Sequence, residues 1–249
     1  RRWLLVQAAA LSASLQFLTI APPIVRRPFD NREMGAAVGY FPLIGLLIGL
    51  LVSGARALAI SAIGPLLAAA LSLAVWVIAT GALHLDGLLD SCDGLFGGHT
   101  PERRLEIMRD HHVGAFALTG GVLVLLVKCA ALAEWADGWR ALAIVPVAAR
   151  CGLSLAVVMQ PYARPQGTGS VLKANAGHAQ ALSAGIIGLA VALVLGGWSG
   201  LIVLVGTLLV QAAIIALIRS KIPGLTGDSY GALVELGELA ALVLGACIR

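Results

Sequence analysis

Charge is scarce in this sequence. Lys, Arg, Asp and Glu make up only 12% of its 249 residues, about half the fraction found in typical soluble domains. Hydrophobic residues make up 59%, so the chain lacks the polar groups that would cover a water-facing surface. This composition excludes an ordinary soluble fold. It predicts a protein that is embedded in the lipid bilayer, a solvent that requires no polar coat.

Cysteine and aromatic residues are also few. The four cysteines, Cys92, Cys129, Cys151 and Cys247, form no C-x-x-C pair, so the sequence predicts neither a disulfide framework nor a zinc site. Aromatic residues make up 5% of the chain and are not interleaved with basic ones, so we expect no nucleic-acid partner. The net charge of +4 instead fits the excess of Lys and Arg on the cytoplasmic side of membrane proteins.

Long apolar runs are abundant. A membrane-spanning helix needs about 20 mostly apolar residues, and these runs lack the alternation of a membrane β-barrel. The first run, Trp3–Ile20, is interrupted by polar residues, so we expect a retained helix that either spans the bilayer or lies at its surface. We predict an all-α, polytopic integral membrane helix bundle of seven or eight helices, with residues 1–249 forming a single domain. The other predicted spans are Tyr40–Ile60, Leu66–Leu83, Val113–Ala133, Ala141–Met159, Ala179–Leu195, Leu201–Ile218 and Ala232–Ile248.

The connections between these runs differ in length and charge. Gly196–Gly200 is a tight, uncharged turn and Glu134–Arg140 is short, whereas four connections are long and polar. If every predicted run spans the bilayer, these four lie on one side of it. Because they carry most of the Lys and Arg residues, we expect that side to be the cytoplasm. The four are Ala21–Gly39, residues 84–112, Gln160–His178 and Arg219–Gly231.

A stripe of aspartates is the sharpest motif. Asp86, Asp90 and Asp93 follow directly after an apolar run at the spacing i, i+4, i+7, which places three mutually repelling carboxylates on one helix face. Hard cations such as Mg²⁺ bind carboxylate oxygens and water. A solvated acidic helix end is the alternative, but the aspartates are interleaved with Leu88 and Leu89 at a predicted membrane boundary. We therefore expect the stripe to bind metal.

A second acidic motif lies near the C-terminal end of the chain. Asp228 and Glu235 are seven residues apart on one helix face, and Glu238 follows three residues later. Carboxylates at the start of an apolar span are rarely idle, although a helix N-terminus also favours negative charge. Asp228 falls on the same predicted side of the membrane as the first stripe. Two acidic clusters that face one cavity could hold paired cations for phosphoryl transfer.

Basic residues on the same side are candidates to bind phosphate, which the planar guanidinium group suits. Arg103 and Arg109 lie in a short amphipathic segment in which Arg103, Glu106 and Asp110 share one side. A solvated, salt-bridged helix is the alternative for that segment. Arg164 lies in a Gly-rich connection, for which an ordinary turn is the alternative.

Two charges and three histidines raise further expectations. Lys128 and Arg150 lie inside predicted spans, where a charge is costly and indicates a partner or a cavity; a structural ion pair is the alternative to a functional role. His84, His111 and His112 are candidate proton acceptors. Because His84 points away from Asp86 on a helix of 3.6 residues per turn, we expect it to support the site without binding the metal.

These motifs occur together in a known family. At Phe41-Pro-Leu-Ile-Gly45, His84-Leu-Asp-Gly-Leu-Leu-Asp-Ser-Cys-Asp-Gly94, Leu105-Glu-Ile-Met-Arg-Asp110, Tyr162-Ala-Arg164, Thr226-Gly-Asp-Ser-Tyr-Gly-Ala232 and Glu235-Leu-Gly-Glu238 the chain resembles the cobalamin synthase, or adenosylcobinamide-GDP ribazoletransferase, family. The segments stand in the family's order across nearly the whole chain.

The resemblance implies a reaction, a cofactor and a location. Adenosylcobinamide-GDP and α-ribazole, or its 5′-phosphate, would give adenosylcobalamin, or its phosphate, and GMP, with Mg²⁺ as cofactor in the bacterial cytoplasmic (inner) membrane. Asp86, Asp90, Asp93 and Asp228 would be catalytic and would bind metal together with Glu235. Candidates for binding substrate or phosphate are Arg103, Arg109, Asp110, Arg150, Arg164 and Glu238.

Two alternatives and several questions stay open at this point. Asp90-Ser-Cys-Asp93-Gly94 also resembles the opening of the CDP-alcohol phosphotransferase motif, but Gly97-Gly98 replaces the expected Ala-Arg. An ion transporter with a carboxylate site is the rival from another class, although transporters favour interrupted helices at the membrane midplane and internal repeats. The sequence leaves open whether the chain forms a homo-oligomer, how many metal ions it binds, which group is the general base and which lower bases it accepts.

Overall fold

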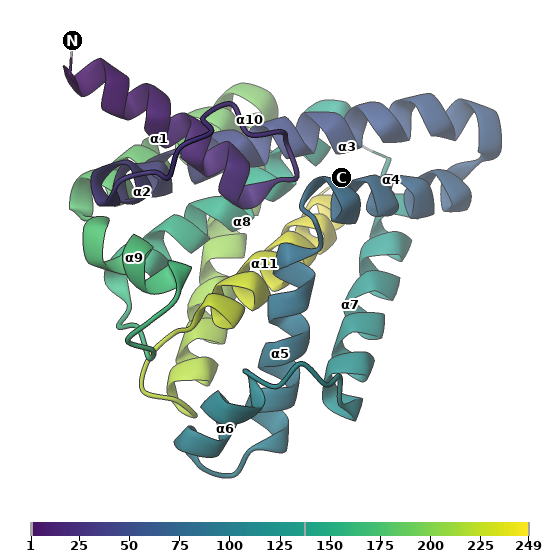
Figure 1. Cartoon of the computed structure of the whole chain (residues 1–249). Helices are drawn as coiled ribbons and strands as arrows, with labels where there is room; N and C mark the ends of the chain where they lie inside the picture. The colour runs from purple at the N-terminus through teal and green to yellow at the C-terminus, as the bar shows by residue number, and fades with distance from the viewer. Residues whose placement is uncertain (1, 137, 249) are drawn as a thin grey trace.

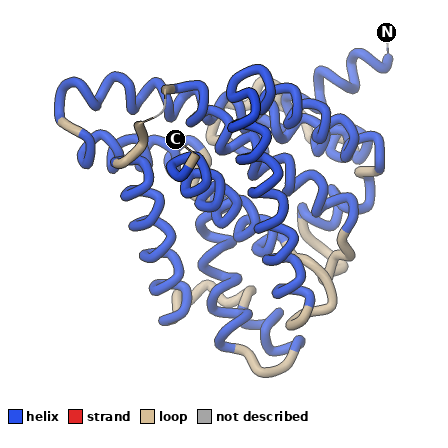
Figure 2. Tube along the Cα trace, turned by 180° about the vertical axis from the view of Figure 1, so that it is seen from behind, coloured by secondary structure: helices blue, strands red, loops and turns tan. Residues whose placement is uncertain are grey.

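The computed structural model describes residues 2–136 and 138–248. Within these residues the protein is built from helices and contains no β-strand (Figure 1, Figure 2). The predicted all-α fold is therefore confirmed. The elements are α1 (Arg2–Leu18), α2 (Asn31–Ala37), the 3₁₀ turn η1 (Val38–Tyr40), α3 (Phe41–Ile63), α4 (Pro65–Ala79), α5 (Leu83–Gly97), α6 (Pro101–Ile107), α7 (Ala115–Ala133), α8 (Trp139–Met159), α9 (Thr168–Asn175), α10 (His178–Arg219) and α11 (Gly227–Cys247).

Every predicted apolar run forms a helix, but not every one is long enough to span by itself. Among the described residues, five helical stretches are long and apolar enough to cross a membrane, and α4 with α5 would form a sixth if the bent pair is one span. The apolar part of α1, Leu4–Leu18, is shorter than a span. The polytopic membrane fold follows, with fewer independent spans than the seven or eight predicted helices.

Helix α10 contains two of the predicted spans. Its backbone leaves helical geometry at Gly197, with φ 55° and ψ −133°, in the left-handed region that glycine adopts at little cost. The two halves fold back on each other, since Ala192 and Leu204 belong to one buried cluster with Cys151 of α8. The predicted tight turn at Gly196–Gly200 is confirmed.

A right-angled bend determines the direction of α5. Helices α4 and α5 meet at 90°, and the bend contains Gly81 and Ala82, both with positive φ. A non-glycine residue in this conformation costs about 1–2 kcal/mol, so the packing around α5 must compensate. Beyond the bend, α5 runs between α7 and α11 and packs on both (Figure 1).

Helix α8 is the central element of the bundle. It packs against α3, α10 and α11, and most of its side chains are buried, from Leu142 to Val157. Burial on all sides explains why this helix is apolar around its circumference. Helices α9 and α11 thus pack directly on this central helix, and α5 packs on α11.

The four long connections form a continuous series of contacts. Helix α2 of the first connection packs on α9 of the third. The contact is so close that a Cβ on Gly35 would lie 2.1 Å from the carbonyl oxygen of Asn175. The third connection contacts the fourth, because the amide of Ala163 donates to the carbonyl of Leu225 at 2.7 Å. The fourth connection in turn contacts the second, because Arg104 donates to the carbonyl of Lys221 at 3.0 Å. This continuity supports the prediction that all four lie on one side of the membrane.

Candidate functional site

The site is built where α5 and α11 cross. Gly87 and Gly231 face each other there, since a Cβ on Gly231 would lie 3.0 Å from the Cα of Gly87. A Cβ on Gly87 would in turn lie 2.8 Å from the carbonyl oxygen of Asp228. The absence of side chains lets the two backbones touch, as small residues do at helix contacts in membranes. This close crossing brings the α5 aspartates next to the start of α11.

The α5 stripe forms a helix as predicted. Asp86 is exposed, while Asp90 and Asp93 are half-buried. Asp90 lies within electrostatic range of Asp86, Asp93 and Asp228, with Arg164 as the opposing cation. Four carboxylates from two helices therefore share one region, and one arginine neutralises only part of their charge. The predicted proximity of the two acidic motifs is thus met for Asp228.

Asp93 has a structural role that spacing did not predict. One of its carboxylate oxygens accepts the amide of Gly114 at 2.6 Å, and the other accepts the amide of Ala117 at 2.9 Å. These amides belong to the N-terminus of α7, whose first turn has no partner within its own helix. Asp93 therefore caps α7 from α5 and also holds its charge at the edge of the acidic region.

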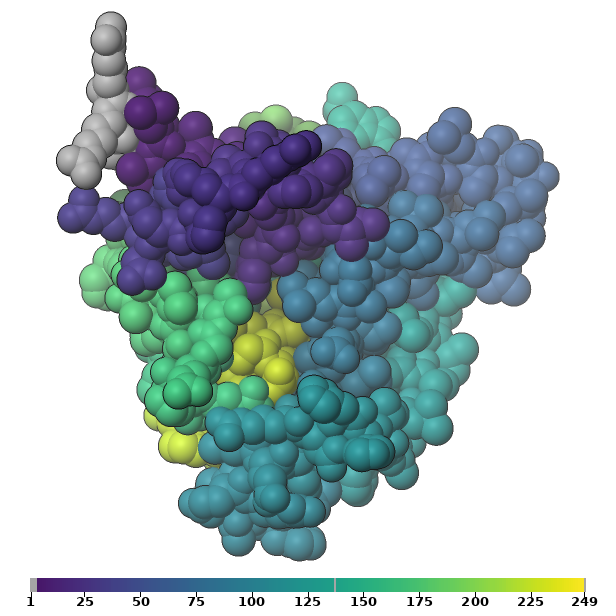
Figure 3. All heavy atoms as spheres, viewed as in Figure 1, coloured from purple at the N-terminus to yellow at the C-terminus, as the bar shows by residue number. Residues whose placement is uncertain are grey.

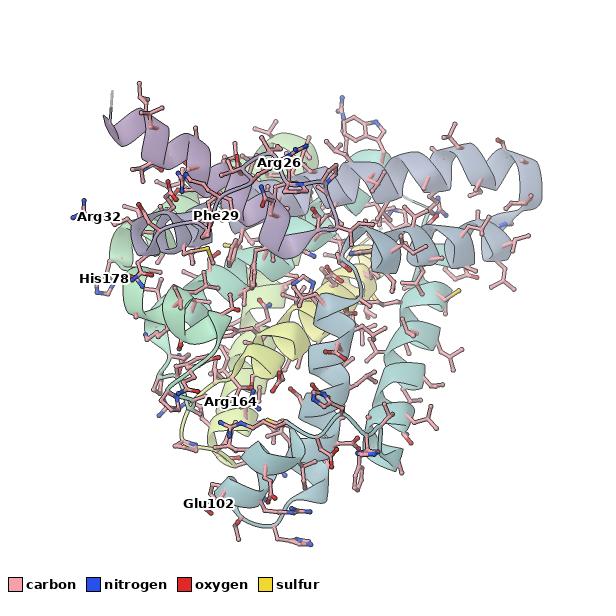
Figure 4. All side chains as sticks on the ribbon, viewed as in Figure 1. Arg26, Phe29, Arg32, Glu102, Arg164 and His178 are labelled. Atoms are coloured by element: carbon pink, nitrogen blue, oxygen red, sulfur yellow. The ribbon has the colours of Figure 1, made fainter. Side chains whose placement is uncertain are left out.

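Asp228 is positioned by the start of its own helix and by a neighbouring loop. Thr226 caps α11 by accepting the amide of Ser229 at 3.1 Å. One carboxylate oxygen of Asp228 pairs with the Arg164 guanidinium at 2.7 Å. Figure 4 shows Arg164 on the loop beside the start of α11. The loop is held there because Tyr162 and Leu225 form a short parallel bridge.

A cavity of about 280 Å³ opens between these elements. In Figure 3 its entrance is the hollow framed by the N-terminal helices, the α9 segment and α5, with α11 at its floor. Asp86, Asp228 and Arg164 line it together with His84 and Tyr162. The rings of Tyr162 and Tyr230 lie 5.8 Å apart, and burial raises the pKa of the Tyr162 hydroxyl. The cavity therefore combines charged groups with neutral hydroxyl groups.

The other two acidic residues of the second motif lie in a separate buried cluster. Lys128 of α7 contacts Glu235 at 2.5 Å and Glu238 at 2.7 Å, and Arg150 of α8 contacts Glu238 at 2.6 Å. Each of these side chains is at most 7% exposed. We predicted Glu235 as a metal ligand and Arg150 and Glu238 as substrate-binding residues. The structure instead pairs them with one another, which is the structural alternative considered for Lys128 and Arg150.

The predicted phosphate-binding residues of α6 and the segment after it do not line the cavity. Arg103 pairs with Glu106 at 2.7 Å, and both side chains are more than half exposed. Asp110 is exposed and contacts the ring of His112 at 2.6 Å. Arg109 is exposed as well. The solvated, salt-bridged surface considered as an alternative therefore describes this segment as it stands.

The carboxylates do not form a ready coordination shell. Within the part of the chain that the structure describes, no three His, Cys, Asp or Glu side chains are close enough together to hold a metal ion. Asp228 is engaged by Arg164. That pair involves Oδ2 of Asp228, so a cation between α5 and α11 could bind through the other carboxylate oxygen once the carboxylates move closer together.

The cavity also contains residues that the sequence did not single out. Phe17 and Phe41 line it, and their rings stack at 5.9 Å with an interplanar angle of 20°. Leu153, Val157 and Leu172 belong to the same lining. In the sequence these residues look like any others in an apolar helix, so no local pattern could have marked them.

Comparison with known proteins identifies relatives over nearly the full length. The cobalamin-5-phosphate synthase family matches residues 10–246. An adenosylcobinamide-GDP ribazoletransferase of Pseudomonas paraeruginosa is 42% identical over 239 residues, which cover 94% of this chain and 96% of the relative. The protein of the same description from Desulforamulus reducens is 38% identical over 248 residues, covering 97% and 98%. One from Brevibacillus brevis is 34% identical, covering 93% and 95%. No solved structure matches the chain at a significant level.

Proposed function

This chain belongs to the cobalamin-5-phosphate synthase family, and from that premise we propose that the cavity between α5 and α11 is its active site. The activity is that of an adenosylcobinamide-GDP ribazoletransferase, the final step of cobalamin synthesis. The observation that carries the proposal is the convergence of Asp86 and Asp228 on one cavity. They come from the two acidic motifs on which the family resemblance rests, and they are 142 residues apart in sequence.

The carboxylates that line the cavity, together with Asp90 beside them, offer donor chemistry that fits Mg²⁺. Asp86, Asp90 and Asp228 offer hard carboxylate oxygens, and the single arginine opposite them leaves negative charge unbalanced. We assign these three residues as metal ligands, with Asp93 beside them as the cap of α7. Glu235 is left out of the proposed set, because binding a metal would break its ion pair with buried Lys128.

The proposed reaction is a displacement at phosphorus. A ribazole hydroxyl forms a bond to the phosphorus nearest cobinamide, and the bond from that phosphorus to the bridging oxygen breaks. GMP leaves with the bonding electrons, and the hydroxyl proton passes to a carboxylate of the cavity. Bound Mg²⁺ would neutralise charge that develops on the diphosphate.

Arg164 is the proposed phosphate-binding residue. Its side chain is 13% exposed and lies at the cavity beside Asp228. A guanidinium at this position could bind the diphosphate through two hydrogen bonds. Arg103, Arg109 and Asp110 remain predictions for a more distant part of the large substrate.

The proposed location is the bacterial cytoplasmic membrane, with the cavity facing the cytoplasm. The cavity lining includes residues of the second, third and fourth long connections. The four long connections together carry most of the Lys and Arg residues, which gather on the cytoplasmic side of membrane proteins. Both substrates, α-ribazole and adenosylcobinamide-GDP, would reach the cavity from that side.

The test is a reconstituted reaction. Protein purified into lipid nanodiscs is incubated with adenosylcobinamide-GDP and α-ribazole, with Mg²⁺ or with a chelator, and GMP and cobalamin are measured. We expect product only with the metal. Asp90→Asn and Asp228→Asn should lower kcat about 100-fold or more, which equals about 2.7 kcal/mol. Glu102→Gln, on the exposed surface of α6 (Figure 4), is the matched control. Wild-type GMP release by a stably folded Asp90→Asn variant would refute the metal site.

A further inference from the structure

The cavity between α5 and α11 has two chemically different walls. The charged wall consists of Asp86, Asp228 and Arg164. Another part of the lining, the aromatic wall, is apolar and contains the stacked rings of Phe17 and Phe41. A site for a metal and a diphosphate alone would not need an aromatic wall. The contrast indicates a ligand with a flat apolar part and a polar part that ends in a reacting group.

Two buried polar groups on the cavity lack partners. The Nδ1 atom of His84 and the hydroxyl of Tyr230 have no hydrogen-bond partner among the described residues. His84 is 3% exposed and Tyr230 is 6% exposed, and both line the cavity. Leaving a buried polar group unsatisfied costs about 1–3 kcal/mol. Unpartnered polar groups on the cavity lining suit hydrogen bonds to a ribose.

The size of the cavity distinguishes between the two substrates. Its volume of about 280 Å³ lies just below the roughly 300–1,000 Å³ of ordinary ligand cavities, so it suits a small ligand. A benzimidazole nucleoside is of that scale, whereas a corrinoid that carries a nucleoside diphosphate is several times larger. Only the diphosphate end of the larger substrate would therefore reach the charged wall.

We propose that this cavity is the α-ribazole subsite, a proposal that rests on the transferase function given above. The benzimidazole ring packs against Phe17, which is stacked on the fully buried Phe41, and the ribose contacts Tyr230 and His84. This orientation directs the ribose hydroxyl to the charged wall, where the phosphorus of the second substrate arrives. The aromatic wall then determines which lower bases are accepted.

The first experiment measures equilibrium binding of α-ribazole to the protein in nanodiscs, without Mg²⁺ and without adenosylcobinamide-GDP. We expect Tyr230→Phe and Phe17→Ala each to weaken binding about tenfold, equal to about 1.4 kcal/mol. Tyr40→Phe is the matched control, because the Tyr40 hydroxyl bonds to Gln7 at 2.8 Å and the residue does not line the cavity. Unchanged α-ribazole affinity in both cavity variants overturns the proposal.

The second experiment separates binding from a general structural defect. In steady-state assays, Tyr230→Phe and Phe17→Ala should raise KM for α-ribazole about tenfold and leave KM for adenosylcobinamide-GDP within twofold of wild type. Phe17→Ala should also shift the preference toward nucleosides with bulkier bases. A rise in KM for adenosylcobinamide-GDP in place of α-ribazole would overturn the assignment.

Failure of the metal proposal can be recognised independently. Asp90 is not part of the cavity lining, so Asp90→Asn should bind α-ribazole as wild type does while losing turnover. If Asp90→Asn turns over normally but Tyr230→Phe and Phe17→Ala bind weakly, the subsite stands and the metal site falls. If the two cavity variants bind α-ribazole normally while Asp90→Asn is inactive, the metal site stands and the α-ribazole subsite is excluded.

Discussion

Gly87 and Gly231 touch across the crossing of α5 and α11, where a Cβ on Gly231 would lie only 3.0 Å from the Cα of Gly87. This contact connects sequence to function directly. It lets the backbone of α11 approach α5 closely enough for Asp228 to lie beside Asp90. The acidic region thus depends on two residues that have no chemistry of their own.

The crossing gives the first prediction. Gly87→Ala should force the two helices apart, since its Cβ would meet backbone atoms of α11. We expect the free energy of unfolding to fall by about 1–3 kcal/mol, which is typical of overpacking. We also expect GMP release to fall by more than this loss of stability explains. Thermal unfolding in nanodiscs and the transferase assay measure the two effects. Gly54→Ala is the control, because nothing lies within 4 Å of its added Cβ; equal effects of both changes would contradict the role of the crossing.

The buried ion cluster gives the second prediction. Lys128→Met would leave Glu235 and Glu238 without the cation that contacts both. Breaking a buried pair by removing one partner typically costs about 3–5 kcal/mol, so we expect a strongly lowered melting temperature. Lys128→Met combined with Glu235→Gln should recover part of the loss, because the second change removes one unpaired charge.

The control for this cluster is a cation that is not buried. Arg32 is exposed and points away from the protein (Figure 4), so Arg32→Met should leave the free energy of unfolding within about 0.5 kcal/mol of wild type. A Lys128→Met protein as stable as Arg32→Met would show that the cluster does not hold α7, α8 and α11 together.

The pair of Asp110 and His112 gives a pH-dependent prediction. Hydrogen bonding to Asp110 raises the pKa of His112 above its ordinary 6.5, and hydrogen bonding to His112 lowers the pKa of Asp110 below its ordinary 3.8. The His112 contribution to stability is complete below 6.5 and is lost as the pH rises through the raised pKa. The Asp110 contribution is complete above 3.8 and is lost as the pH falls through the lowered pKa.

NMR titration of the His112 ring measures this coupling. In wild type the ring should keep its proton at a higher pH than a free histidine does, and in Asp110→Asn the titration should move down toward 6.5. His111→Gln serves as control, because the adjacent ring is not the one in contact with Asp110. A titration that Asp110→Asn leaves unmoved would contradict the pair.

Membrane topology gives the fourth prediction. In a cysteine-free background, His99→Cys and Gln166→Cys should be labelled by a membrane-impermeant reagent from the same side, because their connections belong to one contact series. Ser199→Cys, in the exposed turn within α10, should be labelled from the opposite side. Labelling of positions 99 and 166 from opposite sides would exclude a shared cytoplasmic site.

Local patterns determined much of this protein. Long apolar runs predicted the helices because lipid requires each span to satisfy its own backbone hydrogen bonds. The turn at Gly196–Gly200 could be predicted because only a short, flexible break separates two apolar runs there. The i, i+4, i+7 spacing of Asp86, Asp90 and Asp93 was sufficient to predict one acidic face, since helical periodicity is local.

Only the tertiary structure decided which charges meet. The sequence grouped Glu235 with Asp228, but α11 carries Asp228 to the cavity and Glu235 to Lys128. Phe17 and Phe41 became an aromatic wall through the packing of α1 on α3, which no local pattern indicates. The physical reason is that helix periodicity depends on neighbours in sequence, whereas ion pairing and cavity formation depend on contacts between helices that are far apart along the chain.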